Sequence, residues 1–464
     1  MVCRPGGRLV NQWRLSQIAA WSQGRLDGED ANVVGVGTDS RALPAGALFV
    51  ALRGERFDGH DYIGPDLSAA AVMVSHPVRD DRPQVIVDDT LAGLGRFAST
   101  WREHLPTRVV GLTGSNGKTT VKEMLASILT QAGPTQSTRG NFNNHIGVPL
   151  SLLTVEPSHH YAVIEMGANH AGEIAALTAM ARPHVALVNN AGPAHLEGFG
   201  DLAGVARAKG EIYGGLAPDG VAVINADDAF AEDWLALNCT RRVLRFGIEQ
   251  PAEVRGHYHG GHLQAVTPLG EFELDLPLPG YHNAMNALAA TAAALGAGAD
   301  LGAVRAGLAN VRPVAGRLRQ LQGSEGIMIL DDTYNANPGS LSAGLDVLGE
   351  QPGTHWLVLG DMAELGETAL ALHRAAGERA RAGGVERLFT LGRLSHEAAE
   401  AFGAGAIHCP NLDALANAVG RSADTAARPL TILIKGSRSM GLERLLARLL
   451  PDGDAAHVGG HHAV

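Results

Sequence analysis

The stretch Val109-Val110-Gly111-Leu112-Thr113-Gly114-Ser115-Asn116-Gly117-Lys118-Thr119-Thr120 decides the fold, because an apolar run ends there in a glycine-rich turn that carries lysine and threonine. Beyond the turn, apolar residues recur at helical spacing, which predicts a one-sided helix: Val121, Met124, Leu125, Ile128 and Leu129. A strand, a loop and a helix in this order are typical of a phosphate-binding loop.

The side chains of this loop suit a nucleotide triphosphate. Glycines let backbone N–H groups turn onto phosphate oxygens, and the helix N-terminus adds positive partial charge. Lys118 can neutralise phosphate, and the Thr119 hydroxyl can bind Mg²⁺. The common pattern G-x-x-x-x-G-K-[ST] needs glycine at position 112, where this chain has Leu112. The loop is better written T-G-S-N-G-K-T-T.

The composition describes an ordinary globular protein. A chain of 464 residues predicts about three domains of ~150 residues each. The net charge of −11 argues against nucleic acid as the main partner. No apolar run approaches the ~20 residues of a membrane span, and the N-terminus lacks a signal-peptide apolar region, so we expect a cytoplasmic protein. Cys3, Cys239 and Cys409 lie far apart and suggest neither disulfides nor a zinc site.

The pattern of apolar runs predicts an α/β fold in three domains. Residues 1–106 read as a small α/β unit, with a helix at 15–21 and strands at 33–36, 47–52, 71–74 and 85–87. Residues 107–314 alternate strands (108–112, 161–166, 185–188, 221–225) with helices, which predicts a mostly parallel sheet covered on both faces.

Residues 315–464 alternate again, with strands at 327–330, 356–359, 388–391 and 430–434. This resembles a doubly wound, Rossmann-like fold, yet no G-x-G-x-x-G fingerprint follows its first strand, so a nicotinamide role is unsupported. We expect the Gly/Ala-rich and His-bearing tail from about residue 452 to be disordered or a cloning remnant.

Several polar residues of the central unit follow strands, at the edge where parallel sheets bind ligands. Glu165 ends one strand and is a candidate Mg²⁺ ligand or a satisfied structural carboxylate. His195 lies in the next strand-end loop and fits either a metal ligand or an ordinary loop histidine. Lys209 is ambiguous, because a cation on a helix is usually a solvated surface charge and a plain ammonium cannot bind a metal. Asn283 and Asn286 share a helical face and suit a purine edge or a helix cap.

Further candidate loops lie in the two flanking units. Thr38-Asp39-Ser40-Arg41 follows a strand of the first unit, where Arg41 could bind a diphosphate. A Ser-Arg pair after a strand is, however, more often ordinary loop surface. Three strand-end loops mark the third unit: Asp331–Pro338, Leu359–Gly366 and Lys435–Glu443.

Taken in order, these motifs resemble the Mur ligases, the ATP-dependent amide ligases of peptidoglycan precursor synthesis, and most closely the MurF type. T-G-S-N-G-K-T-T is shared with folylpolyglutamate synthase and indicates only the superfamily. The subtype rests on six stretches: Asn141–Pro149, Glu165–Ala168, Gly192–Glu197, Tyr334–Pro338, Leu359–Gly366 and the segment that begins at Lys435. Asn190 departs from the pattern, because the resemblance leads us to expect an apolar residue there.

The resemblance implies roles for individual residues. Thr119 and Glu165 would hold one Mg²⁺, while His195 and a carbamylated Lys209 would help to hold a second, with Lys118 completing the catalytic set. ATP contacts are implied for Thr113, Gly114, Ser115, Asn116, Gly117, Lys118, Thr119, Thr120, Asn283 and Arg317. Substrate contacts are implied for Ser40, Arg41, Asn141, Asn143, Asn144, Tyr334, Asn335, Asn337 and Lys435.

The resemblance also implies the reaction and the parts of the chain that serve it. The substrates would be UDP-N-acetylmuramoyl-tripeptide, on the N-terminal domain, and D-alanyl-D-alanine, on the C-terminal one, with ATP on the central domain and a monomeric enzyme. Rivals are folylpolyglutamate synthase, another Mur ligase, and a nucleotide-driven switch or motor. The non-standard loop spacing counts against the last.

Overall fold

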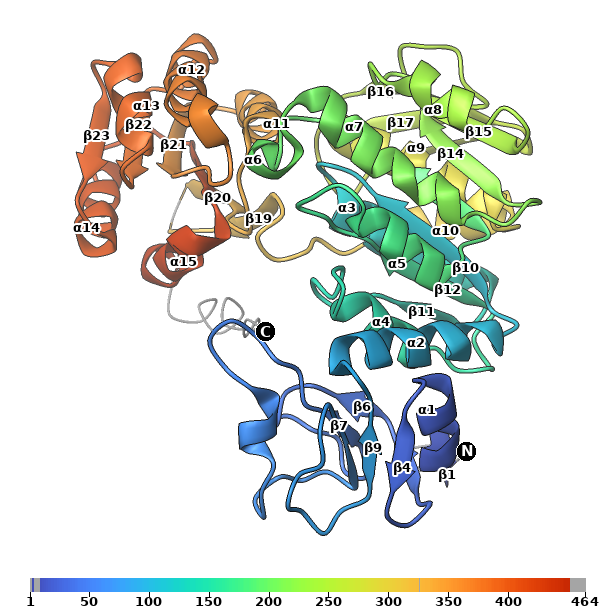
Figure 1. Cartoon of the computed structure of the whole chain (residues 1–464). Coiled ribbons are helices and arrows are strands. Elements are labelled where there is room, and N and C mark those ends of the chain that lie inside the picture. The colour runs from blue at the N-terminus through green and yellow to red at the C-terminus, as the bar shows by residue number, and fades with distance from the viewer. Residues whose placement is uncertain (1, 4–8, 325, 451–464) are drawn as a thin grey trace.

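Three main β-sheets organise the chain in the computed structural model, which describes residues 2–3, 9–324 and 326–450 (Figure 1). Figure 1 shows the first sheet in blue below the second, and the third beside the second. This three-domain α/β architecture confirms the predicted fold class. The tail expected to be disordered lies outside the described residues.

The N-terminal domain is built on a five-stranded sheet in the order β4-β9-β8-β7-β6, parallel except for β4. A pair β1 (Val2–Cys3) and β2 (Leu9–Val10) precedes it. Its elements are β3 (Gln12–Arg14), α1 (Leu15–Trp21), β4 (Arg25–Asp27), β5 (Asn32–Val34), β6 (Val36–Gly37), β7 (Leu48–Val50), η1 (Gly59–Tyr62), β8 (Ala71–Val74), β9 (Gln84–Ile86) and α2 (Thr90–Glu103).

One predicted strand of this domain is wrong. The run 33–36 is not continuous, because Gly35 adopts φ 83° and turns the chain there. The residues before it form β5, which pairs antiparallel with β3, while those after it form β6 in the five-stranded sheet. An apolar run alone does not reveal such a break.

The central domain carries a nine-stranded sheet in the order β11-β12-β10-β13-β14-β15-β16-β17-β18, parallel from β11 to β16 and antiparallel beyond. Its elements are β10 (Arg108–Thr113), α3 (Lys118–Ala132), β11 (Thr135–Ser137), α4 (Gly147–Leu153), β12 (Tyr161–Glu165), α5 (Glu173–Ala181), β13 (Val185–Val188), α6 (Leu196–Phe199), α7 (Leu202–Gly210), η2 (Glu211–Gly215), β14 (Val221–Asn225), α8 (Ala231–Leu237), β15 (Arg242–Gly247), β16 (Val254–His259), β17 (His262–Thr267), β18 (Gly270–Asp275), α9 (Tyr281–Gly296) and α10 (Leu301–Ala309).

Both faces of this sheet are covered, as predicted. Along β13, Val185 and Leu187 belong to the apolar cluster that contains α3, α9 and α10, whereas Ala186 and Val188 belong to the cluster on the opposite face. Alternate strand residues point to opposite faces, so burial on both sides requires the continuous apolar runs seen in the sequence. Because β10, β12 and β13 are parallel, the candidate residues at their carboxyl ends lie at the same edge of the sheet.

The C-terminal domain has a six-stranded sheet in the order β19-β20-β24-β21-β22-β23, parallel except for β19. Its elements are β19 (Arg319–Gln322), β20 (Ile327–Asp332), α11 (Pro338–Gly349), β21 (Thr354–Gly360), η3 (Gly366–Thr368), α12 (Ala369–Ala382), β22 (Arg387–Leu391), α13 (Ser395–Phe402), β23 (Ala406–Cys409), α14 (Leu412–Ala423), β24 (Leu430–Lys435), η4 (Arg438–Met440) and α15 (Glu443–Leu449).

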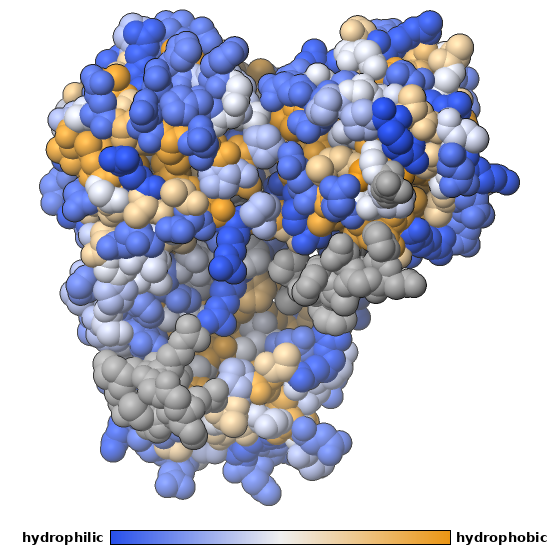
Figure 2. Space-filling model, turned by 180° about the vertical axis from the view of Figure 1, so that it is seen from behind, coloured by the Kyte–Doolittle hydropathy of each residue, from blue (hydrophilic) through white to orange (hydrophobic). Residues whose placement is uncertain are grey.

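Figure 2 shows hydrophilic and hydrophobic side chains mixed over one face of all three lobes. Within the described ranges, no helix combines the length and apolar character needed to cross a bilayer.

Candidate active site

The glycine-rich loop joins β10 to α3 as the sequence predicts. Gly117 adopts φ 79°, and a Cβ at this position would lie 2.4 Å from Oδ1 of Asn286 and 2.6 Å from Nδ2 of Asn189. Both its conformation and its surroundings therefore require glycine. The loop therefore packs closely against Asn189, at the end of β13, and Asn286, on α9.

Lys118 begins α3 and folds back over the loop. Its Nζ donates to the backbone oxygen of Gly114 at 2.7 Å and to that of Ser115 at 3.4 Å. Burial lowers the pKa of Lys118, while the nearby carboxylate of Glu165 opposes the shift. Among the residues that the structure describes, this cation has only carbonyl oxygens as hydrogen-bond partners, which suits the loop to receive an anion.

A large cavity of about 1030 Å³ connects this loop with the C-terminal domain. Many of the predicted site residues line it: Ser115, Asn116, Gly117, Lys118, Thr120, Asn141, Asn143, Asn144, Glu165, His195, Asn283, Arg317, Tyr334, Asn335, Asn337 and Lys435. Others do not: Ser40, Arg41, Thr113, Gly114, Thr119 and Lys209.

Glu165 is the last residue of β12, and only one of its two carboxylate oxygens accepts a hydrogen bond. Its side chain is about 2% exposed, and its Oε1 accepts from Nδ2 of Asn143 at 2.8 Å. Its Oε2 has no hydrogen-bond donor, and the nearest cation is Nζ of Lys122 at 3.9 Å. A buried carboxylate oxygen without a donor is costly unless a ligand completes it, and a hard divalent cation fits that place.

Thr119 lies behind the cavity wall rather than on it. Its Oγ1 accepts from Nη2 of Arg317 at 3.1 Å, a contact that crosses from the central domain to the segment leading into the C-terminal domain. The guanidinium of Arg317 also stacks 4.1 Å from the Tyr334 ring. Arg317 therefore links the phosphate-binding loop to the third domain.

His195 and Glu364 meet across the two domains. Nδ1 of His195 lies 2.5 Å from Oε2 of Glu364, and both residues adopt left-handed backbone conformations, with φ 54° and 61°. Such conformations are unfavourable for residues with a Cβ and persist where the surrounding structure imposes them. Burial lowers the pKa of His195, although the Glu364 carboxylate opposes that shift. A neutral imidazole is the form that binds metals.

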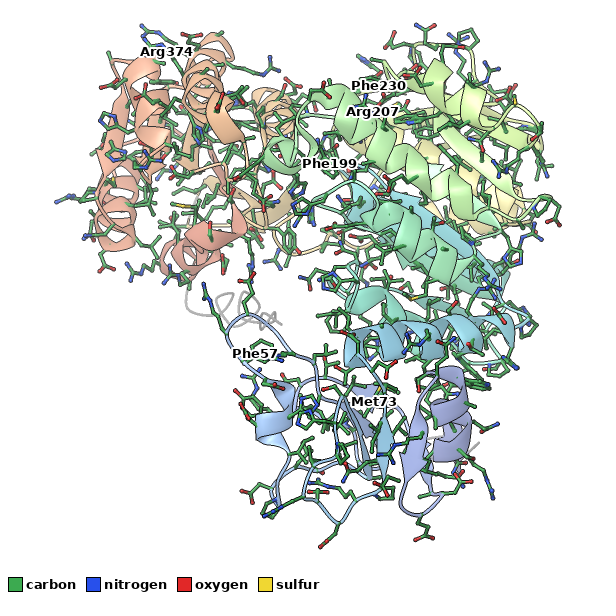
Figure 3. The ribbon with its side chains drawn as sticks, viewed as in Figure 1. Phe57, Met73, Phe199, Arg207, Phe230 and Arg374 are labelled. Atoms are coloured by element: carbon green, nitrogen blue, oxygen red, sulfur yellow. The ribbon has the colours of Figure 1, made fainter. Side chains whose placement is uncertain are left out.

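Lys209 lies inside the protein, which overturns the interpretation of a solvated surface charge. Its side chain is 1% exposed on α7, and its Nζ lies 5.3 Å from the ring centre of Phe199, which Figure 3 labels on α6. Burial, with the charge of Lys118 nearby, lowers the pKa of Lys209 to about 7. Much of this amine is therefore neutral at neutral pH.

The C-terminal domain contributes a second set of polar groups to the cavity. Nδ2 of Asn337 donates to Oδ1 of Asn116 at 2.7 Å, directly onto the phosphate-binding loop. Nζ of Lys435 lies 2.5 Å from Asp332 and donates to the backbone oxygen of Asn335 at 2.9 Å. Both domains therefore build the same site.

Three stretches match models of one family, and together they cover most of the chain. They are described as "Mur ligase family, catalytic domain" for residues 32–101, "Mur ligase middle domain" for 112–294 and "Mur ligase, glutamate ligase domain" for 316–438. The chain belongs to the Mur ligase family.

Relatives of this Mur ligase match it over nearly its whole length. The UDP-N-acetylmuramoyl-tripeptide--D-alanyl-D-alanine ligase of Escherichia coli is 46% identical over 95% of this chain and 98% of its own. That of Bacillus subtilis is 35% identical over 91% and 94%. A crystal structure of MurF from Acinetobacter baumannii superimposes with a TM-score of 0.90 at 34% identity, over 95% and 99%.

Two further structures bear on the nucleotide and on a rival interpretation. MurF from Thermotoga maritima, solved with ADP, has a TM-score of 0.77 at 29% identity over 89% of this Mur ligase and 96% of its own chain. Folylpolyglutamate synthase of Mycobacterium tuberculosis is 21% identical with a TM-score of 0.62, a likeness of fold alone. These matches give no support to a nucleotide-driven switch or motor.

Asn190, the departure from the expected pattern, has a defined place in this Mur ligase. Its Oδ1 accepts from the backbone N–H of Asn116 at 2.8 Å, and its Nδ2 donates to the backbone oxygen of Asn116 at 3.1 Å. The side chain therefore binds both the backbone N–H and the backbone carbonyl of one residue of the phosphate-binding loop, which an apolar residue cannot do.

Sequence reasoning missed a chain of buried amides beneath the loop. Nδ2 of Asn189 donates to Oδ1 of Asn286 at 2.9 Å, and Nδ2 of Asn286 donates to Oδ1 of Asn283 at 3.1 Å. Nδ2 of Asn283 in turn donates to the backbone oxygen of Pro279 at 2.7 Å. Asn189 follows β13 directly, and that strand-end position was the signal that could have identified it.

The predicted residues Ser40 and Arg41 lie on the N-terminal domain, apart from the cavity. The Arg41 guanidinium donates to Asp39 at 2.9 and 2.8 Å, and its side chain is 82% exposed. Another exposed loop of this domain carries Phe57, which Figure 3 labels.

Proposed function

We propose that this Mur ligase uses ATP to join D-alanyl-D-alanine to UDP-N-acetylmuramoyl-tripeptide in the cytoplasm, a step of peptidoglycan precursor synthesis. The observation that carries the proposal is the shared cavity, in which the phosphate-binding loop faces polar residues of the C-terminal domain. The names of the relatives, which match over nearly the whole chain, support both substrates.

The chemistry explains why a phosphate site and an amine site share one cavity. A carboxylate resists attack by an amine, because its charge repels the nucleophile and oxide is a poor leaving group. The terminal carboxylate of the tripeptide therefore attacks the γ-phosphate of ATP, forming a C(O)–O–P bond as the bond to ADP breaks. The amine of D-alanyl-D-alanine then attacks the acyl carbon, and phosphate leaves as the amine loses a proton. Positioning and charge neutralisation dominate such a transfer.

Lys118 supplies the fixed positive charge for the first step. Its Nζ donates to two carbonyl oxygens of the loop, and phosphate oxygens would be stronger acceptors for the same ammonium. The loop residues Thr113 to Thr120, together with Asn283 and Arg317, form the proposed ATP site. Removing one such preorganised contact typically lowers the rate about 10²- to 10³-fold.

The oxygen and nitrogen groups around the loop fit Mg²⁺. Thr119 and Glu165 form the proposed first site, supported by the donor-free Oε2 of Glu165. His195 and Lys209 form the proposed second site, with Lys209 as a carbamate. Bound Mg²⁺ would neutralise phosphate oxygens during transfer. The neutral fraction of Lys209 supports the modification, because a free amine can attack CO₂ and release one proton, which leaves an anionic oxygen ligand.

The remaining predicted residues divide between the two other substrates. Ser40 and Arg41 are proposed to contact the UDP group from the N-terminal domain, residues 1–106, and Asn141, Asn143 and Asn144 to contact the muramoyl-peptide. Tyr334, Asn335, Asn337 and Lys435 are proposed for the amine substrate in the domain that begins at residue 315. The central domain, residues 107–314, would hold ATP.

Initial rates of ADP release test this function. We expect release only when ATP, Mg²⁺, the UDP-tripeptide and D-alanyl-D-alanine are all present, with L-glutamate unable to replace the dipeptide. Lys118→Ala should lower the rate at least 10²-fold while leaving the fold intact, whereas Arg421→Ala, on the exposed side of α14, should not lower the rate. ADP release without any acceptor, or with L-glutamate alone, would contradict the proposal.

A further inference from the structure

Two loops at the edge of the C-terminal sheet carry opposite charges side by side. One follows β21 and holds Glu364, and the other follows the adjacent strand β24 and holds Arg438. The backbone N–H of Ala363 donates to Oγ of Ser437 at 2.8 Å, and the N–H of Ser437 donates to the backbone oxygen of Asp361 at 2.9 Å. The two loops are thus fixed to each other, and both side chains line the cavity.

Arg438 is the more accessible of the two cavity cations carried by β24 and the loop that follows it. The side chain of Lys435, at the end of β24, is about 2% exposed and already shared between Asp332 and a carbonyl oxygen. The side chain of Arg438 is 44% exposed, its one ion-pair partner among the described residues is Glu443, at 3.3 Å from Nη1, and its guanidinium carbon lies 5.8 Å from the centre of the Tyr334 ring. A guanidinium carries five N–H groups, so most of its donors remain available to a carboxylate.

The two charges also define a direction across the cavity. Glu364 touches His195 of the central domain, on the side of the phosphate-binding loop. Arg438 is paired with Glu443, the first residue of α15, within the C-terminal domain itself. A zwitterion with its carboxylate at Arg438 and its amine at Glu364 would therefore have its amine beside His195 of the central domain.

We propose that Arg438 binds the free terminal carboxylate of the dipeptide substrate, while Glu364 directs the amine end toward the phosphate-binding loop. This assignment rests on the proposed function, because it supposes an amine substrate with a carboxylate at its far end. The amine must reach the acyl carbon, so the carboxylate at the other end of the dipeptide needs a cation of its own. Arg438 then selects amines with a free acid and excludes dipeptides whose C-terminus is blocked.

The wild-type enzyme alone provides the first measurement. D-alanyl-D-alanine and D-alanyl-D-alaninamide differ only in the charge of the far end, and their KM values are compared in the ADP-release assay. A charged hydrogen bond at that end predicts a KM about 10- to 100-fold higher for the amide. Equal KM values for acid and amide would overturn the assignment while leaving the ligase function intact.

Variants at position 438 provide the second measurement. Arg438→Gln should raise the KM for the acid about 10- to 100-fold, leave the KM for ATP unchanged and abolish the preference for acid over amide. Arg438→Lys should keep part of that preference, because it retains the charge but not the planar fork. Arg444→Gln, on the following helix outside the cavity, should behave as wild type. An Arg438→Gln enzyme that keeps the wild-type preference would overturn the assignment.

Discussion

Replacing Lys209 by methionine should change how the stability of the metal-free protein depends on pH. The amine is 1% exposed, and its pKa is about 7 in the folded protein against an ordinary value of 10.5. This difference corresponds to about 5 kcal/mol in the free energy of unfolding. Methionine has a similar length and no charge, so the variant avoids the cost of a buried ammonium.

The direction of the effect follows from proton binding in the two states. Between pH 7 and 10.5 the unfolded chain carries the Lys209 proton and the folded chain has lost it, so unfolding takes up a proton. Wild-type stability therefore gains about 1.4 kcal/mol per pH unit from this residue across that window. Below pH 7 both states are protonated and the whole cost remains, whereas above pH 10.5 both states are neutral.

The assay is urea unfolding followed by tryptophan fluorescence from pH 6 to pH 10, with EDTA and without CO₂. Lys209→Met should be more stable than wild type by up to about 5 kcal/mol at pH 6, with an advantage that shrinks as pH rises. Lys122→Met is the control, because it removes another buried lysine, paired with Glu123 and Glu165, and leaves Lys209 in place. A constant difference between Lys209→Met and wild type across this range would refute the reasoning.

Three further outcomes are expected. Asn190→Ala removes the two hydrogen bonds from this side chain to the Asn116 backbone and should raise the KM for ATP about tenfold in the ADP-release assay. An unchanged KM would refute a role of Asn190 in shaping the phosphate-binding loop. Lys435→Met leaves the Asp332 carboxylate buried and unpaired, so it should lower the free energy of unfolding in urea by about 3–5 kcal/mol. Adding Asp332→Leu should restore most of that free energy. A small loss in the single variant would contradict this prediction. Carbon NMR in ¹³C-bicarbonate should show one carbamate signal that Lys209→Met loses, and a signal that persists would exclude this residue.

Several regular elements could be predicted because their signals are local. The helix over residues 15–21 and the strands over 185–188 and 221–225 have the predicted bounds. Continuous apolar runs mark buried parallel strands, and the polar residues that follow them mark the ligand edge. The strand expected at 33–36 was wrong because one glycine conformation redirects the chain.

The roles of Lys209 and Asn190 depend on packing that no local pattern records. Lys209 is buried where α7 packs against α5, α6 and η2, while Asn190 binds the backbone of a residue 74 positions earlier in the chain. Composition did hold one signal. The chain has only four lysines, at 118, 122, 209 and 435, and Lys122, Lys209 and Lys435 are each 1% exposed, so arginine supplies the surface cations. A lysine in such a chain is a poor candidate for an ordinary surface charge.

Transfer of oxygen from the substrate carboxylate tests the central claim most directly. UDP-tripeptide labelled with ¹⁸O in its terminal carboxylate is incubated with ATP, Mg²⁺, D-alanyl-D-alanine and the enzyme, and the released phosphate is analysed by mass spectrometry. Attack of the carboxylate on the γ-phosphate predicts one ¹⁸O atom in each phosphate, because the bridging oxygen leaves with phosphorus. Phosphate without label, released at the same rate as ligated product, would contradict the account.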